Sequence, residues 1–255
     1  MLYLKQPVQI GKVRIPDRLV LPPLHTGKAR EGRVTPEQTA GYVRRSAGGA
    51  VGLLIMEYCY IARQGQSVKT QVSLAEDGVV ESHRALVEAV HREGSRILCQ
   101  LNHAGLRAPA EVTGMEAVAP SAVPDIDAKP GAPLPRALEI EEIGAIEDAF
   151  ATAARRAQAA GYDGVEIHGA HGYLYNQFFS PLLNHRHDAY GQDSVADRAR
   201  IFTETIGKIR RDVGPDFLIA VRFGGCDYME GGSTLADCAA GAKLLKEAGA
   251  DLLDI

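Results

Sequence analysis

Short apolar segments alternate with longer helical segments along almost the whole chain, and this alternation constrains the fold more than any other feature. The apolar segments are rich in branched residues and nearly continuous in hydrophobicity, as expected for strands that are covered on both faces. They lie at 19–24, 52–57, 96–101, 164–168, 217–223 and 252–255. Strands that are separated by helices indicate βα units and a parallel sheet.

The helical segments carry start and stop signals of their own. Thr35 and Pro36 form an N-cap and first-turn pair at the start of one helix. The segment 141–160 is rich in alanine, has apolar residues three and four positions apart, and is followed by Gly161. Further helices are expected at 82–93, 194–213 and 234–248, each followed by a glycine.

Six strands are predicted, and the last one ends with Asp254 and Ile255. A closed barrel of eight parallel strands needs two further βα units, roughly 60 residues. We therefore expect an α/β fold, a (β/α)8 TIM barrel that is incomplete here, as one domain over residues 1–255 that lacks its last strands. The alternative, an open six-stranded sheet, would expose two long apolar edges, which natural proteins avoid.

The composition argues against several classes of partner. The chain has 255 residues, 45% of them hydrophobic, and a net charge of −4. Dispersed cations give no reason to expect nucleic acid, and no apolar run approaches the about 20 residues that cross a bilayer. The first residues lack the layout of a secretory signal, and four scattered cysteines fit a reducing compartment. We expect a cytoplasmic protein that acts on a small molecule, alone or as a homo-oligomer.

Two long segments interrupt the alternation. Residues 102–138 contain six prolines and follow the third strand, and residues 173–193 follow the fourth strand. Loops that follow strands lie on the C-terminal face of a parallel barrel, where catalytic groups are normally placed. Both segments are therefore expected on the active face.

The fourth strand ends directly on two histidines and a tyrosine, in His168-Gly-Ala-His171-Gly-Tyr173. Two imidazoles can donate hydrogen bonds to one oxygen and polarise a carbonyl, nitro or carboxylate group. A nearby tyrosine can supply a proton. Two other interpretations stay open: the histidines are satisfied by local backbone, or they bind a metal, although no third ligand is apparent.

Three further features lie at the ends of other strands. Arg222 ends the fifth strand and needs a partner if it is buried, either an anionic cofactor or a carboxylate such as Glu57 or Glu166. Gln100 ends the third strand and suits the edge of a heterocycle because it both donates and accepts. The segment 22–27 leaves the first strand and is either a ligand-facing turn or an ordinary rigid one. No dinucleotide fingerprint, phosphate loop or nucleophile elbow is present.

Together these residues resemble the NADH:flavin oxidoreductase family, the old yellow enzymes. The resemblance extends from Arg18 to Ile255 and is most specific in HGAHGYLYNQFFSPLLNHRHDAYG at 168–191. It implies an eight-stranded βα barrel that binds FMN non-covalently at its C-terminal mouth and uses NADH or NADPH as reductant. It also implies that the FMN phosphate is held by loops after strands seven and eight, which lie outside this sequence.

The resemblance assigns roles to residues on several strands. A cation beside the flavin stabilises its reduced, negatively charged form, which is the role implied for Arg222. The residues implied to contact FMN are Pro23, Leu24, His25, Tyr58, Gln100 and Arg222. The residues implied to bind the substrate and take part in catalysis are His168, His171 and Tyr173, with Tyr173 delivering the proton.

Two departures from the common family pattern keep alternatives open. His25 stands where many members have threonine or cysteine, and its surroundings are closer to the dienoyl-CoA reductase branch. The segment Glu57-Tyr58-Cys59 is similar to the corresponding segment of trimethylamine dehydrogenase and its relatives. We therefore expect hydride transfer from NAD(P)H through FMN to an activated C=C bond. The alternatives are the N-terminal barrel of a multidomain iron–sulfur flavoprotein, whose cluster would lie in a longer parent chain, and a non-catalytic barrel.

Overall fold

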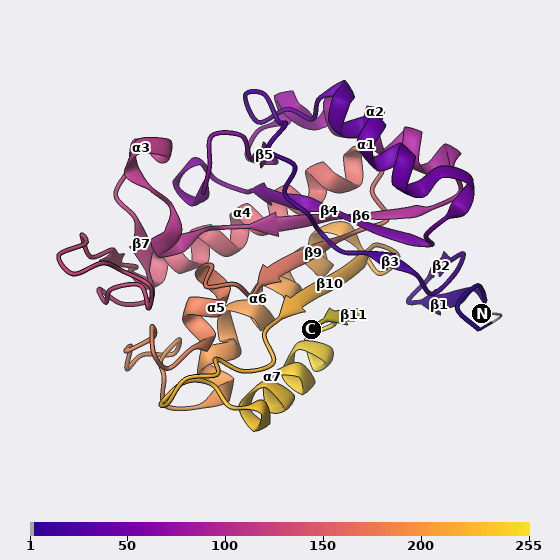
Figure 1. Ribbon diagram of the computed structural model, residues 1–255. Coiled ribbons are helices and arrows are strands. Elements are labelled where there is room, and N and C mark those ends of the chain that lie inside the picture. Colours follow the sequence, from indigo (N-terminus) through magenta and orange to yellow (C-terminus); the bar gives the residue numbers. More distant parts are fainter. Residues whose placement is uncertain (1–2) are drawn as a thin grey trace.

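The computed structural model describes residues 3–255 and contains one curled parallel sheet (Figure 1). Its six main strands follow one another in chain order from one edge of the sheet to the other, with the short strand β5 (Val72–Ser73) paired to β4. The six are β3 (Val20–Leu21), β4 (Leu53–Tyr60), β6 (Arg96–Asn102), β9 (Gly164–Gly169), β10 (Leu218–Phe223) and β11 (Leu252–Asp254). The predicted incomplete βα barrel of six units is confirmed.

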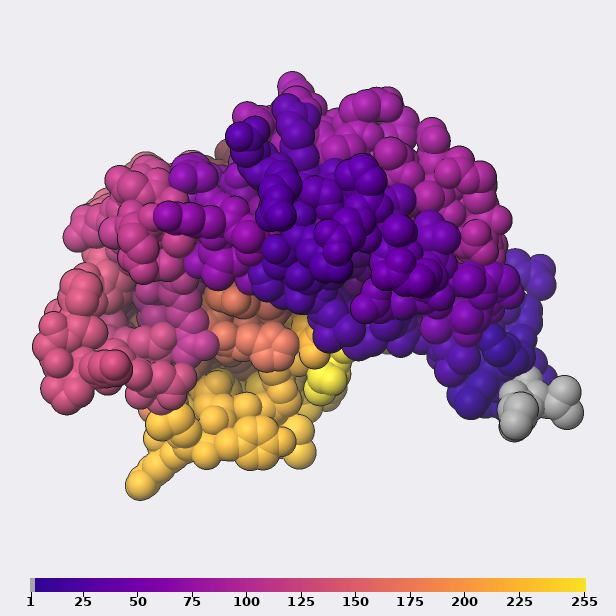
Figure 2. Space-filling view, turned by 45° about the horizontal axis from the view of Figure 1, so that its top comes forward, coloured from indigo at the N-terminus to yellow at the C-terminus, as the bar shows by residue number. Residues whose placement is uncertain are grey.

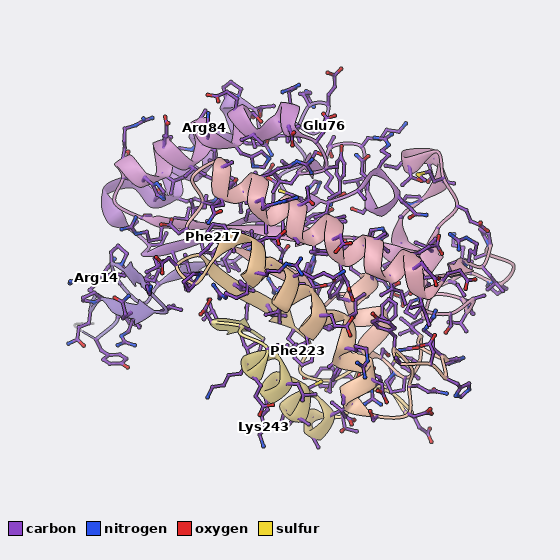
Figure 3. The ribbon with its side chains drawn as sticks, turned by 180° about the vertical axis from the view of Figure 1, so that it is seen from behind. Arg14, Glu76, Arg84, Phe217, Phe223 and Lys243 are labelled. Carbon is purple, nitrogen blue, oxygen red and sulfur yellow. The ribbon has the colours of Figure 1, made fainter. Side chains whose placement is uncertain are left out.

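Five long helices pack on the outer face of this sheet. They are α1 (Pro36–Ser46), α2 (Val80–Arg92), α4 (Ile140–Ala159), α6 (Val195–Val213) and α7 (Leu235–Glu247). Figure 3 shows α4, α6 and α7 side by side over the sheet, with Phe217 just before the start of β10 and Phe223 at its end. Side chains such as Phe150, Phe202 and Val221 fill the layer between helices and strands. No helix within residues 3–255 has the length and hydrophobicity needed to span a membrane.

A second, smaller core lies inside the curled sheet at the amino ends of the strands. It consists of Ile15, Leu53, Ile55, Leu98, Leu218 and Ala220. The antiparallel hairpin of β1 (Val8–Ile10) and β2 (Val13–Ile15) packs its apolar residues against this core. The hairpin lies by the amino ends of the strands in Figure 1 and was not predicted from the sequence.

The two segments that interrupt the alternation both contain regular structure. Residues 102–138, which the prolines indicate as a long irregular segment, include α3 (Ala110–Thr113) and a short parallel pair, β7 (Val118–Ala119) and β8 (Arg136–Ala137). Residues 173–193 include α5 (Leu174–Phe179). Short 3-10 turns complete the set: η1 (Ala47–Gly49), η2 (Arg63–Gly65), η3 (Asp77–Val79) and η4 (Gly105–Arg107).

Candidate functional site

The inward side chains of the sheet change from apolar to polar toward the carboxyl ends of the strands. On β6 Leu98 is followed two residues later by Gln100, and on β10 Ala220 is followed by Arg222. Residues two apart on a strand share a face, so these side chains line the same interior. They meet at a cavity of about 270 Å³ lined by Pro23, His25, Tyr58, Gln100, His168, His171, Tyr173 and Arg222.

This cavity contains eight of the nine site residues predicted from the sequence. The exception is Leu24, whose side chain is 54% exposed and does not line the cavity. Figure 2 shows the molecule hollowed between its indigo N-terminal half and its golden C-terminal part, with the orange chain around residues 165–175 at the floor. Convergence of side chains from five separate segments at one hollow is typical of a ligand site.

A buried amide–carboxyl pair forms the floor of the cavity. Gln100 and Glu166 lie opposite each other on β6 and β9, and Gln100 Nε2 donates to Glu166 Oε2 over 2.6 Å. Both side chains are essentially inaccessible, and Glu166 Oε1 has no hydrogen-bond partner within residues 3–255. Burial, and then the nearby carboxylate of Asp254, raise the pKa of Glu166 to about 8. The floor therefore carries a neutral carboxylic acid near pH 7.

Arg222 pairs with a carboxylate that the sequence analysis did not consider. Its Nη1 lies 3.4 Å from Asp254 Oδ2, on the neighbouring strand β11. The expected structural partners Glu57 and Glu166 do not pair with it, because Glu57 is engaged elsewhere and Glu166 binds Gln100. At 3.4 Å the contact is long, and the Arg222 side chain remains partly exposed toward the cavity. The guanidinium is therefore positioned to meet an anion there.

Glu57 organises the turn that leaves the first strand. Its carboxylate accepts hydrogen bonds from the Thr26 amide (3.1 Å), Thr26 Oγ1 (2.6 Å) and Gln38 Nε2 (3.0 Å), and lies 3.1 Å from His25 Nδ1. Burial raises the pKa of Glu57, but these hydrogen bonds outweigh burial and hold the pKa below its usual value. A register shift in β4 between residues 56 and 59 accompanies this arrangement and brings Tyr58 to the cavity. The turn is thus rigid and also faces the ligand space.

The two histidines contact each other. His168 Nε2 and His171 Nδ1 lie 2.9 Å apart, a distance that needs one shared hydrogen. Burial, together with His171 and Arg222, lowers the pKa of His168 to about 3, and burial also lowers the pKa of His171. Both rings are therefore neutral near pH 7. If His168 Nε2–H donates to His171, then His171 Nε2–H is left as a donor toward a ligand.

Two tyrosines stack beside this histidine pair. The rings of Tyr58 and Tyr173 have centroids 5.8 Å apart at an interplanar angle of 24°. Tyr173 also lies edge-on to His168 at 4.9 Å, and Tyr58 lies edge-on to His25 at 5.2 Å. Tyr58 thus connects the His25 turn with the histidine–tyrosine motif across the cavity.

An arginine clamp holds the histidine turn. His171 has φ +60°, a conformation that costs energy for a residue with a side chain. Arg107 Nη1 donates to the His171 carbonyl over 3.1 Å, and Asp125 binds Arg107 through two contacts of 2.7 and 2.9 Å. The proline-rich segment therefore supports the site from a distance.

Sequence reasoning missed Asp254, Arg107 and Asp125 as supporting residues. Asp254 could have been predicted from the sequence. Leu252 and Asp254 share one face of the last strand, as Ala220 and Arg222 share one face of the strand beside it. The pairing of Arg107 with Asp125 has no local pattern in the sequence. Within residues 3–255 no group of three or more His, Cys, Asp or Glu side chains is arranged to hold a metal ion.

Comparisons with known proteins agree with this site. The model of the NADH:flavin oxidoreductase / NADH oxidase family matches residues 3–255. An NADH oxidase of Thermoanaerobacter brockii is 41% identical over 97% of this chain, which spans 38% of that protein. An NADPH dehydrogenase of Bacillus subtilis is 36% identical over 97% of this chain, which spans 71% of that protein.

Solved structures give the same answer. The old yellow enzyme homologue from Zymomonas mobilis superimposes with a TM-score of 0.87 at 32% identity, over 98% of this chain and 72% of that one. A 2-naphthoyl-CoA reductase superimposes with a TM-score of 0.91 at 27% identity, over 98% of this chain and 40% of that one. The predicted resemblance is confirmed: the chain belongs to the NADH:flavin oxidoreductase / NADH oxidase family, the old yellow enzymes.

Proposed function

We propose that the protein is an FMN-dependent oxidoreductase that transfers a hydride from NADH or NADPH to an activated C=C bond. The electron-poor alkene is an enone, an enoate or a dienoyl thioester. One observation supports this above all: His168, His171 and Tyr173 share a single cavity with Gln100 and Arg222. Groups that bind an oxygen therefore lie within reach of groups that suit a flavin.

The residues present fit the flavin ring. Gln100 and Arg222 line the cavity from below, and the buried oxygen Oε1 of Glu166 lacks a partner. Gln100 donates through Nε2 to Glu166, so its Oε1 is free to accept from an N–H group of a heterocycle. The Arg222 guanidinium would offset the negative charge that a reduced flavin ring carries on the same heterocycle. Bound FMN supplies the two-electron chemistry that connects the nicotinamide with the alkene.

The substrate side is carried by the histidines and Tyr173. His171 Nε2–H donates to the carbonyl oxygen of the alkene, and His168 joins it when that oxygen displaces the contact between the two rings. Neutral imidazoles are suited to this role because they polarise the carbonyl without giving up a proton. Tyr173 then donates its hydroxyl proton to the α-carbon.

An anaerobic two-step experiment tests the proposal. The FMN-loaded protein is reduced with NADPH until its visible flavin absorbance is bleached, and 2-cyclohexen-1-one, maleimide or a nitroalkene is then added. We expect the absorbance to return with at least one of these acceptors as the alkene is reduced. If no acceptor restores it, the proposal is wrong. A preparation that neither carries flavin nor takes up added FMN would support the non-catalytic alternative.

A second candidate is the flavin barrel of a larger iron–sulfur flavoprotein. It is favoured by the short span, 38% and 37%, that this chain covers of two of its relatives. Iron quantification in the parent protein distinguishes the two, because the single-domain enzyme needs no iron. We also propose that the protein acts on a small molecule in the cytoplasm, alone or as a homo-oligomer.

A further inference from the structure

A row of hydroxyl groups leads away from the cavity behind Tyr173. Tyr58 stacks on Tyr173, and its hydroxyl lies 3.2 Å from Ser67 Oγ in the loop after β4. Ser67 Oγ in turn lies 3.2 Å from Gln71 Oε1. Burial raises the pKa of Tyr58, and the neighbouring Tyr173 hydroxyl raises it further. Tyr58 is therefore protonated at neutral pH and stands next to the expected proton donor.

Ser67 has two alternative acceptors at the same distance. Its single hydroxyl hydrogen points either to Tyr58 or to Gln71, each 3.2 Å away, while its backbone amide donates to Gln71 Oε1 over 2.8 Å and holds that oxygen in place. When Ser67 donates to Gln71, the Tyr58 hydroxyl is free to donate to Ser67. When Ser67 donates to Tyr58, the Tyr58 hydroxyl hydrogen is free to turn toward the stacked Tyr173, with whose hydroxyl it forms no hydrogen bond in the described residues 3–255. A hydroxyl that can turn in this way passes a proton along a row.

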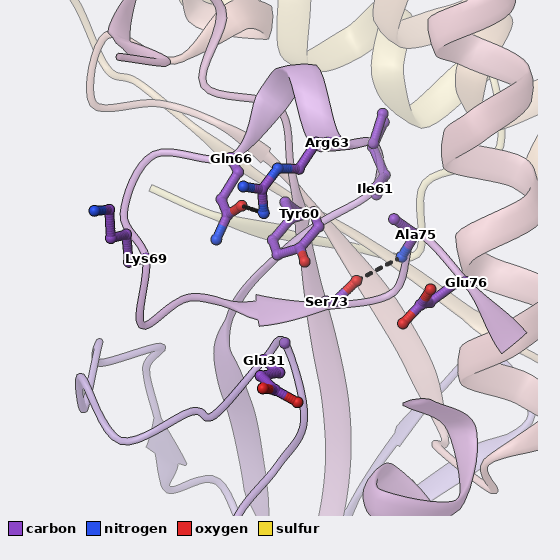
Figure 4. A pocket seen from close by; sticks show the side chains of 11 residues that line it. Glu31, Tyr60, Ile61, Arg63, Gln66, Lys69, Ser73, Ala75 and Glu76 are labelled. Atoms are coloured by element: carbon purple, nitrogen blue, oxygen red, sulfur yellow. Dashed lines mark hydrogen bonds between the residues drawn. The ribbon is translucent and has the colours of Figure 1, made fainter. Parts of the chain in front are cut away.

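The outer end of the row lies near an open cavity. Ser67 is buried, with 7% of its surface exposed, and its sequence neighbours Gln66 and Lys69 line this cavity of about 630 Å³ although Ser67 itself does not (Figure 4). Gln71 Nε2 is buried without a partner within residues 3–255, as expected where a water molecule completes a polar network. This second cavity is separate from the site that His168 and Arg222 line.

We propose that Tyr58 and Ser67 form a relay that returns a proton to Tyr173 after each turnover. The inference rests on the proposed alkene reduction. Tyr173 loses its O–H bond as the α-carbon gains a C–H bond, and the Tyr173 oxygen takes the hydrogen of Tyr58. Tyr58 takes the hydrogen of Ser67, and Ser67 takes a proton from solvent in the same concerted shift. No electrons move in the relay, and one proton from the buffer is consumed. Tyr58 and Ser67 are positioning residues, since they act through Tyr173.

Turnover of the FMN-loaded protein with NADPH tests the relay in Tyr58→Phe, Ser67→Ala and the double variant. We expect each single variant to reduce 2-cyclohexen-1-one about tenfold more slowly, less than the roughly 10²–10⁴-fold worth of a terminal general acid. The double variant should be no slower than either single one, because both changes interrupt the same row. Ser67→Thr should restore the rate, and the solvent deuterium isotope effect should rise in the slow variants.

Two controls separate the relay from other causes. Tyr3→Phe removes an exposed tyrosine hydroxyl that belongs neither to the row nor to the two cavities, and it should leave the rate unchanged. Ferricyanide accepts electrons without a proton on carbon, so all variants should reduce it at the parent's rate. The relay is overturned if Tyr58→Phe and Ser67→Ala turn over the enone as fast as Tyr3→Phe, if their ferricyanide reduction slows equally, or if the two losses multiply in the double variant. A parent protein that reduces no enone overturns the proposed function and the relay together, whereas an active parent with unaffected variants overturns the relay alone.

Discussion

The two ends of the sheet interior are built from the same strands but differ in almost every property. At the amino ends the inward residues are Leu53, Ile55, Leu98, Leu218 and Ala220, and the β1–β2 hairpin packs over them. At the carboxyl ends the same faces carry Gln100, Glu166, His168 and Arg222 around a cavity. The difference teaches that one continuous side-chain register serves stability at one end and ligand binding at the other, as is general for parallel barrels.

The polar end is also incompletely satisfied. Four buried polar atoms at this end have no hydrogen-bond partner within residues 3–255: Glu166 Oε1, His168 Nδ1, and Oδ1 and Nδ2 of Asn102. Buried polar atoms normally find partners, and exceptions concentrate where a ligand or water completes them. The apolar end shows no corresponding conflict among its described side chains, since they contact one another and the hairpin.

The largest effect on chemistry is expected at the polar end. Tyr173→Phe keeps the ring that stacks on Tyr58 but removes the proton donor, so enone turnover should fall by about 10²–10⁴-fold. Its thermal unfolding midpoint should stay close to that of the parent. Steady-state rates with ferricyanide and with an enone, compared in one preparation, separate proton delivery from flavin reduction. Parent-like enone turnover would assign the proton to another group.

The largest effect on stability is expected at the apolar end. Leu98→Ala opens space in the smaller core and should lower the free energy of unfolding by about 2–5 kcal/mol. FMN affinity should be unchanged at temperatures where the variant is folded. Urea unfolding and flavin titration measure the two quantities independently. A loss of FMN affinity without a loss of stability would reverse the roles assigned to the two ends.

The difference in stability between the Glu166→Gln variant and the parent should depend on pH. The folded-state pKa of Glu166 is raised from 4.5 to about 8, so between these values the carboxyl stays protonated in the folded parent but ionises in the unfolded chain, and the parent loses stability as pH rises. Glutamine cannot ionise and avoids that loss. The stability of the variant relative to the parent should therefore improve by at least about 1.4 kcal/mol between pH 5 and pH 8, the worth of one pKa unit. A constant difference would show that Glu166 is not protonated when folded.

The smallest effect is expected from the clamp outside the interior. Asp125→Asn weakens the hold on Arg107 and hence on the His171 turn, which should raise KM for an enone about fivefold, or about 1 kcal/mol, with kcat little changed. Asp127→Asn is the matched control, because Asp127 lies 3.2 Å from Arg107 but its side chain is 85% exposed. Equal effects of the two substitutions would mean that surface charge, and not the clamp, is responsible.

Much of the fold was predictable because its physical determinants are local. Branched apolar runs and capped helices gave all six main strands and the five long helices to within a few residues. The β1–β2 hairpin was missed because each strand has only three residues and is stabilised by packing against the small core. The β7–β8 pair was missed because its partners lie 18 residues apart in a proline-rich segment.

The candidate site was predictable where strand ends identify it, as at Gln100, His168 and Arg222. Its electrostatics were not, because they depend on which groups face each other across strands. The pairing of Arg222 with Asp254 and the neutral state of Glu166 follow from register and burial. The role of Leu24 at the flavin stays a prediction of the family resemblance, because its exposed side chain does not line the cavity and a contact would come from its backbone.

The central claim, that the polar end of the sheet interior holds the flavin, is tested most directly by FMN titration. Visible absorbance and fluorescence quenching report binding to the parent, to Arg222→Leu and to Arg96→Leu, which removes a cation from the amino end of the same sheet. We expect Arg222→Leu to weaken FMN binding about tenfold or more, equivalent to about 1.4 kcal/mol, and Arg96→Leu to leave it unchanged. Equal affinity of all three proteins, or a loss confined to Arg96→Leu, would contradict the account.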